Sequence, residues 1–413
     1  MKLAINTERV IDDLKTLAKF GQVGTGVNRR ALTDVDIASR LWLQEKMRAA
    51  GLETTIDEIG SVSGRTPNCE KYILIGSHTD TVPKGGWLDG AMGVIYGLEL
   101  ARAWIEANRE PNQRLSKTGI EVISFSDEEG RFGGLMGSGV YVGAKSAEEA
   151  RSLIAEDGKS LAEEVDNAGW SGVPALRLDT EKHSAYFEAH IEQGPILESS
   201  ATRIGVVTEI VGVRRARVEF TGRAEHAGTI PMAMRHDASA AVFAFGHAFV
   251  EACKRDGSKD TVWNLGHVDL QPGAYNVVCG RGTVFVEYRD GDPAVLTHLR
   301  AQIDVLAEEV ASAHKVSVNI EEQMHTEPAI MSEALMRSIE VAAEGLGENS
   351  LRMPSGAGHD AMLLAPLIPT AMLFVPSIDG RSHDISENTS EEDIALGVEV
   401  LAGAVEALIH ATT

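Results

Sequence analysis

The residues of this sequence that could do chemistry include histidines and carboxylates that follow short apolar runs. Both kinds of side chain bind divalent metal ions. His78 and Asp80 follow the apolar run at residues 72–75, and Asp89 lies in the loop that leads into the next helical pattern. His78 and Asp89 are therefore candidate metal ligands, and Asp80 could hold the far ring nitrogen of His78 and fix its tautomer. For this motif taken alone, a solvated histidine in a polar turn is an equal alternative.

The same arrangement recurs further along the chain. Acidic or histidine side chains follow three more apolar runs: Glu128 and Glu129 after 120–125, His190 at the end of 186–190, and His383 after 371–375. Adjacent glutamates can divide two tasks, since one can bind metal while its neighbour acts as a general base.

Together these motifs predict a site for two metal ions with five ligands: His78, Asp89, Glu129, His190 and His383. If Asp89 bridges, each ion has three protein ligands and room for a water, an arrangement that polarises a carbonyl and activates that water. Nitrogen and oxygen donors favour Zn or Mn over a soft metal. Each residue alone could be an ordinary hydrogen-bonded or solvated group, but their common position after strands favours the metal site.

The elements that must position these ligands alternate between strand and helix patterns. Apolar runs at 72–75, 120–125, 186–190 and 371–375 are typical of buried parallel strands, and open α/β sheets place their sites at the carboxyl ends of such strands. We therefore expect an α/β fold with a mixed, mostly parallel sheet flanked by helices. The charged, Ala-rich segment 146–183 is predicted to be a helical insertion without chemistry.

From residue 213 the pattern changes to a smaller α+β unit. Its predicted elements follow the order strand, helix, strand, strand, helix, strand: 213–220, 238–253, 262–270, 283–289, 294–313 and 315–320. This order is typical of the ferredoxin-like fold. The sequence thus predicts a discontinuous catalytic domain at 1–212 and 327–413, with a second domain inserted at 213–326.

The amino-acid composition of the chain excludes several classes of partner and site. The 38 basic and 61 acidic residues give a net charge of −23, which argues against nucleic acid and anionic membranes as partners. An anionic substrate would need a local cation. Three scattered cysteines (Cys69, Cys253 and Cys279) indicate neither a disulfide framework nor a thiolate metal site. With no signal-peptide pattern at the start and no membrane-length apolar run, we expect a cytoplasmic protein.

The chain resembles the M20 metallopeptidase clan and, within it, the hydantoinase/carbamoylase amidase family, which includes N-carbamoyl-L-amino-acid hydrolases, allantoate amidohydrolases and β-ureidopropionases. The resemblance covers nearly the whole chain. Its motifs are Gly76–Asp80, Leu88–Gly90, Asp127–Gly130, His190–Pro195, Ala224–Thr229, Asn276–Val278 and Ser377–His383.

The resemblance implies that Glu128 is the general base and that the five residues above bind two divalent ions per subunit, Zn or Mn/Co. It also implies substrate contacts from Gln193, His226, Asn276, Arg289 and a glycine of the Gly356-Ala357-Gly358 turn. In such enzymes the inserted domain serves as a lid and dimerisation domain, and His226 reaches the active site of the partner subunit in a homodimer. Two departures are a loop after Glu129 that is one residue short and Asp384 after the last ligand.

The residues of the inserted domain agree with these roles. A guanidinium such as that of Arg289 grips a carboxylate in bidentate fashion, although a surface ion pair with Asp290 is the alternative. His226 could donate to an oxyanion, and Asn276 could add amide hydrogen bonds. Other histidines without a partner motif are interpreted as structural: His236, His267 and His359.

The resemblance implies hydrolysis of the ureido C–N bond of an N-carbamoyl-L-amino acid to the amino acid, ammonia and carbon dioxide. Allantoate amidohydrolase is the nearest alternative, followed by an aminoacylase or peptidase. A catalytically inactive scaffold or ligand-binding protein would lack Glu128 or a ligand, and none is missing from the sequence.

Overall fold

The structure is a computed structural model, and it describes residues 2–108 and 117–411. The chain divides into two compact units, Met1–Thr208 with Ile330–Thr413, and Glu209–Ala329. The predicted catalytic domain includes residues 1, 109–116 and 412–413, which lie outside the described residues.

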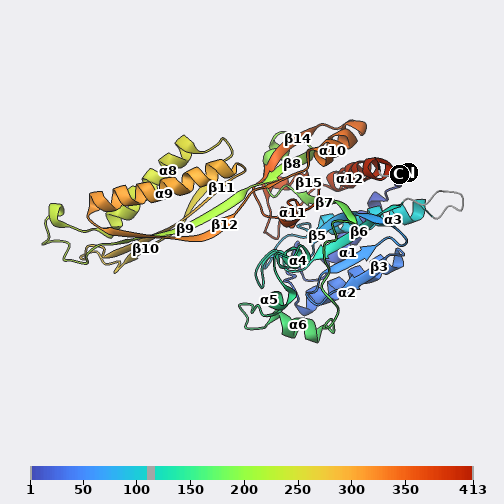
Figure 1. The fold of residues 1–413 in the computed structure, drawn as a ribbon, viewed down its shortest axis with the longest axis horizontal. Coiled ribbons are helices and arrows are strands. Elements are labelled where there is room, and N and C mark those ends of the chain that lie inside the picture. Colours follow the sequence, from blue (N-terminus) through green and yellow to red (C-terminus); the bar gives the residue numbers. More distant parts are fainter. Residues whose placement is uncertain (1, 109–116, 412–413) are drawn as a thin grey trace. The chain divides into compact units, whose positions relative to one another are not determined.

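A mixed sheet forms the centre of the first unit (Figure 1), in the order β13-β8-β15-β7-β5-β6-β4-β3, with β14 also paired to β8. Its strands are β3 (Glu53–Ile56), β4 (Val62–Arg65), β5 (Lys71–His78), β6 (Thr118–Phe125), β7 (His183–Ile191), β8 (Ile204–Ile210), β13 (Ala329–Ile330), β14 (Ser350–Ser355) and β15 (Thr370–Val375). The pairs β5–β6, β5–β7 and β7–β15 are parallel, whereas β3–β4, β4–β6 and β8–β15 are antiparallel. The expectation of a mixed, mostly parallel sheet is confirmed.

Helices flank this sheet. They are α1 (Thr7–Ala18), α2 (Asp34–Ala49), α3 (Ala91–Ala107), α4 (Met136–Tyr141), α5 (Ala147–Arg151), α6 (Leu161–Asn167), α7 (Ile196–Ser199), α10 (Glu333–Gly345), α11 (Ala361–Leu364) and α12 (Glu391–Ala411). Helix α3 packs on β5, β6 and β7, and α10 and α12 pack on β15. Gly93 lets α3 approach closely, because a Cβ there would lie 2.6 Å from the Ala189 carbonyl oxygen. The start of α3, which Asp89 precedes, is thereby held against the central strands.

Three short elements complete the first unit: a two-stranded hairpin, β1 (Gln22–Val23) and β2 (Gly26–Val27), and the 3-10 turn η2 (Ile378–Gly380). The prediction of a helical insertion at 146–183 is wrong in part. Only α5 and α6 form there, and the remainder is turns up to β7. Glycines at positive φ interrupt any longer helix: Gly158, Gly169 and Gly172.

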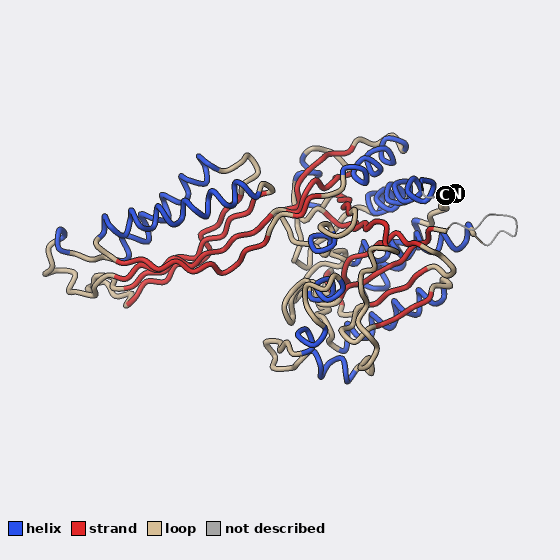
Figure 2. The backbone as a smooth tube through the Cα atoms, in the orientation of Figure 1, coloured by secondary structure: helices blue, strands red, loops and turns tan. Residues whose placement is uncertain are grey.

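The second unit contains β9 (Gly212–Thr221), η1 (Met232–Met234), α8 (Ala238–Asp256), β10 (Val262–Gln271), β11 (Arg281–Asp290), α9 (Pro293–His314) and β12 (Ser317–Thr326). Its four strands form an antiparallel sheet in the order β10-β11-β9-β12, and both helices pack on the sheet (Figures 1 and 2). Alternating residues such as Val218, Phe220 and Tyr288 pack with Phe245 and Leu299 into the core. Large aromatic and aliphatic side chains on one face of the sheet therefore hold α8 and α9 in place.

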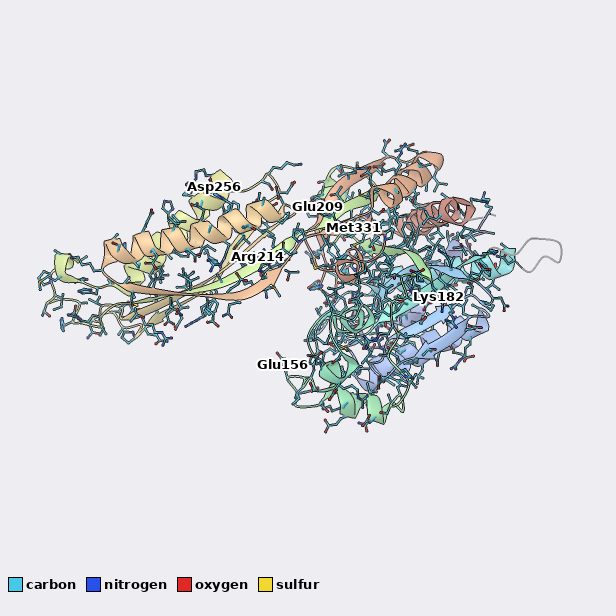
Figure 3. All side chains as sticks on the ribbon, in the orientation of Figure 1. Glu156, Lys182, Glu209, Arg214, Asp256 and Met331 are labelled. Atoms are coloured by element: carbon cyan, nitrogen blue, oxygen red, sulfur yellow. The ribbon has the colours of Figure 1, made fainter. Side chains whose placement is uncertain are left out.

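Charged side chains of the second unit form ion pairs across and along its strands. The buried Arg214 of β9, labelled in Figure 3, places Nη2 2.9 Å from Glu327 Oε1. At the next position of β9, Arg215 Nε lies 2.5 Å from Glu287 Oε2.

Among the described residues, no helix is both long and apolar enough to cross a membrane.

Candidate metal centre

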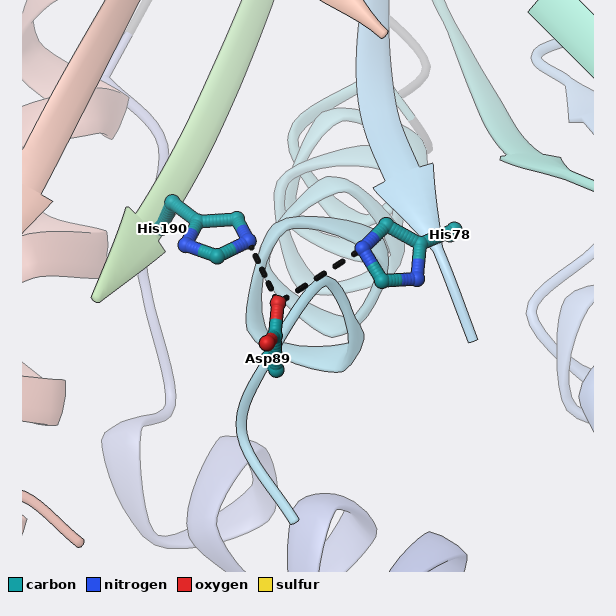
Figure 4. A group of neighbouring side chains, drawn as sticks. All are labelled: His78, Asp89 and His190. Carbon is teal, nitrogen blue, oxygen red and sulfur yellow. Dashed lines mark ion pairs between the residues drawn. The ribbon is translucent and has the colours of Figure 1, made fainter. Parts of the chain in front are cut away.

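Three of the predicted ligands meet at the carboxyl ends of adjacent parallel strands. His78 ends β5, His190 lies near the end of β7, and Asp89 lies just before α3 (Figure 4). Asp89 Oδ1 is 2.9 Å from His190 Nε2 and 3.6 Å from His78 Nε2. All three side chains are buried, and their donor atoms lie within 4.8 Å of one another.

A second group shares the same aspartate. Asp89 Oδ2 lies 3.2 Å from His383 Nε2, which in turn lies 3.5 Å from Glu129 Oε2. Glu129 follows β6 and His383 follows β15 and η2, so four strands deliver the five ligands. The structure therefore brings all five predicted ligands into two groups of three that share Asp89.

The donor set fits divalent cations, since it offers imidazole nitrogens and carboxylate oxygens that already converge. His78 Nδ1 lies 3.0 Å from the carbonyl oxygen of Asp80, and His190 Nδ1 lies 2.9 Å from that of Ile191. A carbonyl can only accept, so each Nδ1 carries a hydrogen, and Nε2, the nitrogen that faces Asp89, is the one left to bind a metal ion. Main-chain carbonyls thus set the tautomer that a metal ligand requires.

Asp80 contacts the far ring nitrogen of His78, but through its main-chain carbonyl and not through its carboxylate. Asp80 Oδ1 is 4.0 Å from His78 Nδ1, and the main-chain carbonyl of Asp80 makes the hydrogen bond instead. The carboxylate is drawn to the buried guanidinium of Arg40, 3.5 Å away, and its Oδ2 accepts the main-chain N–H of Glu129 at 3.2 Å. Asp80 therefore positions ligands of both groups, one through its backbone and one through its side chain.

Glu128, the predicted general base, lies beside the first group. Its Oε2 is 3.6 Å from His78 Nε2, and its side chain is only 12% exposed. Burial raises the pKa of Glu128 well above its usual value, against the opposing charge of His78. A carboxyl group with a raised pKa holds a proton more tightly than an ordinary carboxyl group, which suits a residue that takes a proton and later returns it.

The electrostatics of the centre favour a cation. Burial alone would lower the pKa of His78, but neighbouring Glu128, Asp89 and Asp80 raise it well above its usual value. Conversely, three histidines outweigh the burial of Asp89 and hold its pKa well below the usual range. The carboxylates therefore create a negative potential at the imidazoles, in which a positive ion is stabilised.

The predicted substrate residues of the first unit border this centre in different ways. Gln193 donates its side-chain N–H to Asp89 Oδ2 at 2.9 Å, while its Oε1 has no hydrogen-bond partner among the described residues. Gly356 and Gly358 are exposed, and the chain then turns inward to His359. Gln193 thus contacts a candidate ligand directly.

His359 was expected to be structural, and it packs directly behind the first group. Its ring centroid lies 4.6 Å from that of His190, and its Nε2 is 2.9 Å from Ser355 Oγ. Burial lowers the pKa of His359 well below its usual value, so the ring is neutral. The Gly-Ala-Gly-His-Asp run was the signal that could have drawn attention to it.

Sequence reasoning missed Glu387, which is buried behind Asp89. Its Oε1 accepts the main-chain N–H groups of Leu88 and Asp89, each at 3.1 Å. The short spacing between His383 and Glu387 was the available signal. A further missed feature is Arg131, which anchors the loop after Glu129 through Glu164 Oε1 at 2.6 Å.

The remaining predicted residues belong to the second unit. His226 and Asn276 are exposed and lie in paired loops, since the Ala227 N–H donates to the Asn276 carbonyl at 2.9 Å. Arg289 Nη2 lies 2.8 Å from Glu287 Oε1. Asp290, the alternative partner expected from the sequence, accepts a hydrogen bond from Ser258 Oγ at 2.7 Å.

Comparison with known proteins identifies relatives along the whole chain. A model of peptidase family M20/M25/M40 matches residues 74–407. The chain is 35% identical to an N-carbamoyl-L-amino-acid amidohydrolase of Rhizobium meliloti, covering 97% of this chain and 96% of the relative. It is 34% identical to the allantoate amidohydrolase of Escherichia coli (strain K12), covering 96% of each.

Similar solved structures belong to the same group of amidases. An amidase of the hydantoinase/carbamoylase family from Burkholderia phymatum superposes with a TM-score of 0.92 at 42% identity, covering 100% of both chains. With its converging ligands and a buried carboxyl group beside them, the chain therefore belongs to the M20 peptidase family and is a hydrolase of the hydantoinase/carbamoylase amidase type.

Proposed function

We propose that the protein is a two-metal amidohydrolase that cleaves the ureido C–N bond of N-carbamoyl-L-amino acids. The products are the amino acid and carbamate, and carbamate breaks down to ammonia and carbon dioxide. The observation that carries this proposal is the shared Asp89, whose two oxygens face separate ligand groups, with Glu128 beside the first. The similarity to an N-carbamoyl-L-amino-acid amidohydrolase supports the substrate class.

Two divalent ions, Zn or Mn/Co, are proposed to bind the two groups. His78, Asp89 and His190 would hold one ion, and Asp89, Glu129 and His383 the other. Bound there, such ions supply Lewis-acid polarisation of a carbonyl and lower the pKa of a water.

The protein's own groups then move the protons. Glu128 takes a proton from the attacking water as the water oxygen bonds to the ureido carbon. It returns that proton to the α-nitrogen as the C–N bond breaks, so the amino acid leaves as a neutral amine. The raised pKa of Glu128 suits both steps.

Substrate binding is proposed to involve both units. Arg289 would pair with the substrate carboxylate, since a guanidinium offers two parallel N–H donors. His226 and Asn276 would hydrogen-bond the ureido group, with His226 facing the developing oxyanion. Gln193 and the turn at 356–358 would contact the substrate from the first unit.

We also propose a homodimer in which the second unit serves as a lid over the partner subunit's site, as the family resemblance implies. His226→Ala and Glu128→Gln proteins should then each be inactive, while mixed dimers of the two should regain part of the activity. Absence of recovery after verified subunit exchange would contradict a lid that acts between subunits.

Allantoate is the second candidate substrate, since the chain is nearly as similar to an allantoate amidohydrolase. An M20 aminoacylase or peptidase activity is third. The deciding experiment measures ammonia release from N-carbamoyl-L- and D-amino acids, β-ureidopropionate and allantoate, and cleavage of dipeptides, with metal supplied. Fastest turnover of allantoate or of dipeptides would overturn the proposal.

A cytoplasmic location is retained as part of the proposal. All three cysteines are unpaired in the structure, as a reducing compartment favours.

A further inference from the structure

Glu387 joins two loops that lie far apart in the sequence, the one that carries Asp89 and the one that carries His383. It is 1% exposed. Its Oε1 accepts two successive main-chain N–H groups, those of Leu88 and Asp89, at 3.1 Å each. Its Oε2 accepts the hydroxyl hydrogen of Ser382 at 2.8 Å, next to the ligand His383.

The space for this carboxylate is provided by Gly86. A Cβ at that position would lie 1.8 Å from Glu387 Oε1 and 1.9 Å from its Cδ. Such distances are far below van der Waals contact, so no side chain at residue 86 is compatible with the buried carboxylate. The loop before Asp89 and Glu387 therefore form one packed arrangement.

Ser382 has one hydroxyl hydrogen and two possible acceptors. Its Oγ lies 2.8 Å from Glu387 Oε2 and 3.3 Å from Asp89 Oδ2. The shorter contact to a carboxylate is the stronger hydrogen bond, so the hydrogen points to Glu387. The Ser382 oxygen can then accept the Gln193 side-chain N–H, 3.2 Å away.

This choice matters for Asp89 Oδ2, the oxygen that faces His383. If the Ser382 hydrogen pointed to Asp89, it would occupy a lone pair that a cation in the Glu129–His383 group needs. With the hydrogen drawn to Glu387, Asp89 Oδ2 accepts from Gln193 at 2.9 Å, and its other lone pair faces His383, 3.2 Å away, and is not taken by Ser382.

We propose that Glu387 is a positioning residue that holds the Ser382 hydroxyl hydrogen away from Asp89 and so keeps Asp89 available to bridge both groups. The assignment rests on the proposed two-metal site. It concerns the Asp89, Glu129 and His383 group specifically, because the Asp89 oxygen that faces His78 and His190 is Oδ1.

Glu387→Gln separates the two functions of this carboxylate. The amide oxygen can still accept the Leu88 and Asp89 N–H groups, but the amide nitrogen cannot accept from Ser382. Its N–H would instead donate to Ser382 Oγ and redirect the hydroxyl hydrogen to Asp89. Loss of such outer hydrogen bonds typically weakens metal binding about 10- to 100-fold.

The experiment titrates the metal-free full-length protein with Co²⁺, following bound ion by equilibrium dialysis and the visible absorption of the bound ion. In Glu387→Gln, we expect the site of Asp89, Glu129 and His383 to lose about 10- to 100-fold in affinity and the site of His78, Asp89 and His190 to change little. In a Ser382→Ala background, the same substitution should have no further effect, because no hydroxyl hydrogen remains to redirect. The matched control is Glu392→Gln, the same change at an exposed position on α12.

Gly86→Ala provides a second route that leaves Glu387 in the sequence. The added Cβ should displace the carboxylate and weaken the same site, whereas Gly345→Ala, which meets open space, should bind Co²⁺ as the wild type does. Two results would overturn the role of Glu387 and leave the two-metal proposal intact. One is wild-type Co²⁺ affinity at both sites in Glu387→Gln and Gly86→Ala; the other is an undiminished effect of Glu387→Gln in the Ser382→Ala background. Wild-type protein that binds fewer than two Co²⁺ would overturn the two-metal proposal and this assignment with it.

Discussion

The two ligand groups share one aspartate but differ in their access to water. In the inner group, the side chains of His78 and His190 are 2% and 1% exposed, and main-chain carbonyls fix both rings. In the outer group, the side chain of His383 is 52% exposed, and its backbone adopts a φ of 55°. We therefore expect the inner group to be the more rigid one and the geometry of the outer group to depend on neighbours such as Glu387.

Burial has a second consequence for this comparison. An ion in the inner group would be surrounded by fixed dipoles in a low-dielectric interior, where its interactions with the carboxylates are strong. In the outer group, water competes with His383 for the ion and screens its charge. We therefore expect the outer ion to bind more weakly and to exchange faster.

Stepwise metal removal tests this expectation directly and has the largest predicted effect. A chelator should abolish activity, and the outer ion should leave first, with activity lost in that first step because both ions are proposed to act. Bound metal and ammonia release, measured on the same samples, provide the check; Zn, Mn or Co should restore turnover. Loss of both ions in a single step would show that the two groups do not differ.

His383→Ala gives the matched comparison by substitution. It should remove about one ion per chain and leave the inner one in place, since three ligands of the inner group remain. His190→Ala should weaken the inner site. Equal metal content in the two variants would contradict the inner–outer distinction.

Glu128 and Glu129 sharpen the comparison, because adjacent residues are assigned to different tasks. Glu128→Gln should keep its metal and lose about 10²- to 10⁴-fold in kcat, since only the proton acceptor is removed. Glu129→Gln should lose metal from the outer group. Elemental analysis separates the two, and equal metal loss in both variants would show that the roles are wrongly assigned.

Arg289 extends the comparison from metal binding to substrate binding. A charged hydrogen bond contributes roughly 1.5–3 kcal/mol, so Arg289→Lys should lower kcat/KM by about ten- to a hundredfold, first through KM. N-carbamoyl-L-amino acids should also be strongly preferred over their D forms. Metal content should be unchanged, and near-equal rates on L and D substrates, or an unaffected Arg289→Lys, would place the carboxylate elsewhere.

The smallest effect is a pH dependence that the outer group owes to His383. In the metal-free protein, the hydrogen bond to Asp89 raises the pKa of His383 to about 9. Because this folded-state pKa lies above the unfolded value of about 6.5, the contribution of His383 to stability is full below pH 6.5 and is lost as the pH rises through 9.

Metal binding at the outer group must displace the same proton. Its apparent affinity should therefore rise up to about tenfold per pH unit toward pH 9, with protons released on binding. Calorimetric titration of Co²⁺ in two buffers of different ionisation enthalpy measures this release. An outer-group affinity that is independent of pH between 7 and 9 would contradict a protonated His383.

Much of the site could be predicted from the sequence because of one geometric rule. Parallel strands that are buried on both faces read as apolar runs, and their carboxyl ends meet at one edge of the sheet. His190 and His383 are distant in sequence from His78, yet each follows such a run, so their convergence could be expected before any coordinates.

The elements that could not be predicted from the sequence lack a strong hydrophobic periodicity. Strands β8 and β14 went unpredicted, and the segment at 146–183 was expected to be helical although glycines at positive φ interrupt it. Local composition favours a helix there, but the backbone conformation of each glycine is set by the turn that it completes.

The sequence by itself determined which residue types stand at the ends of the buried strands, and thereby the candidate ligands, the neighbouring Glu128 and the family. Only the tertiary structure decided which group each side chain contacts. The Asp80 carboxylate turns to Arg40 because that guanidinium is buried beside it, and the His78 ring is left to a main-chain carbonyl. Glu387 accepts the main-chain N–H of Asp89, 298 residues away in the sequence, and such a contact depends on how the loops pack, which no local pattern encodes.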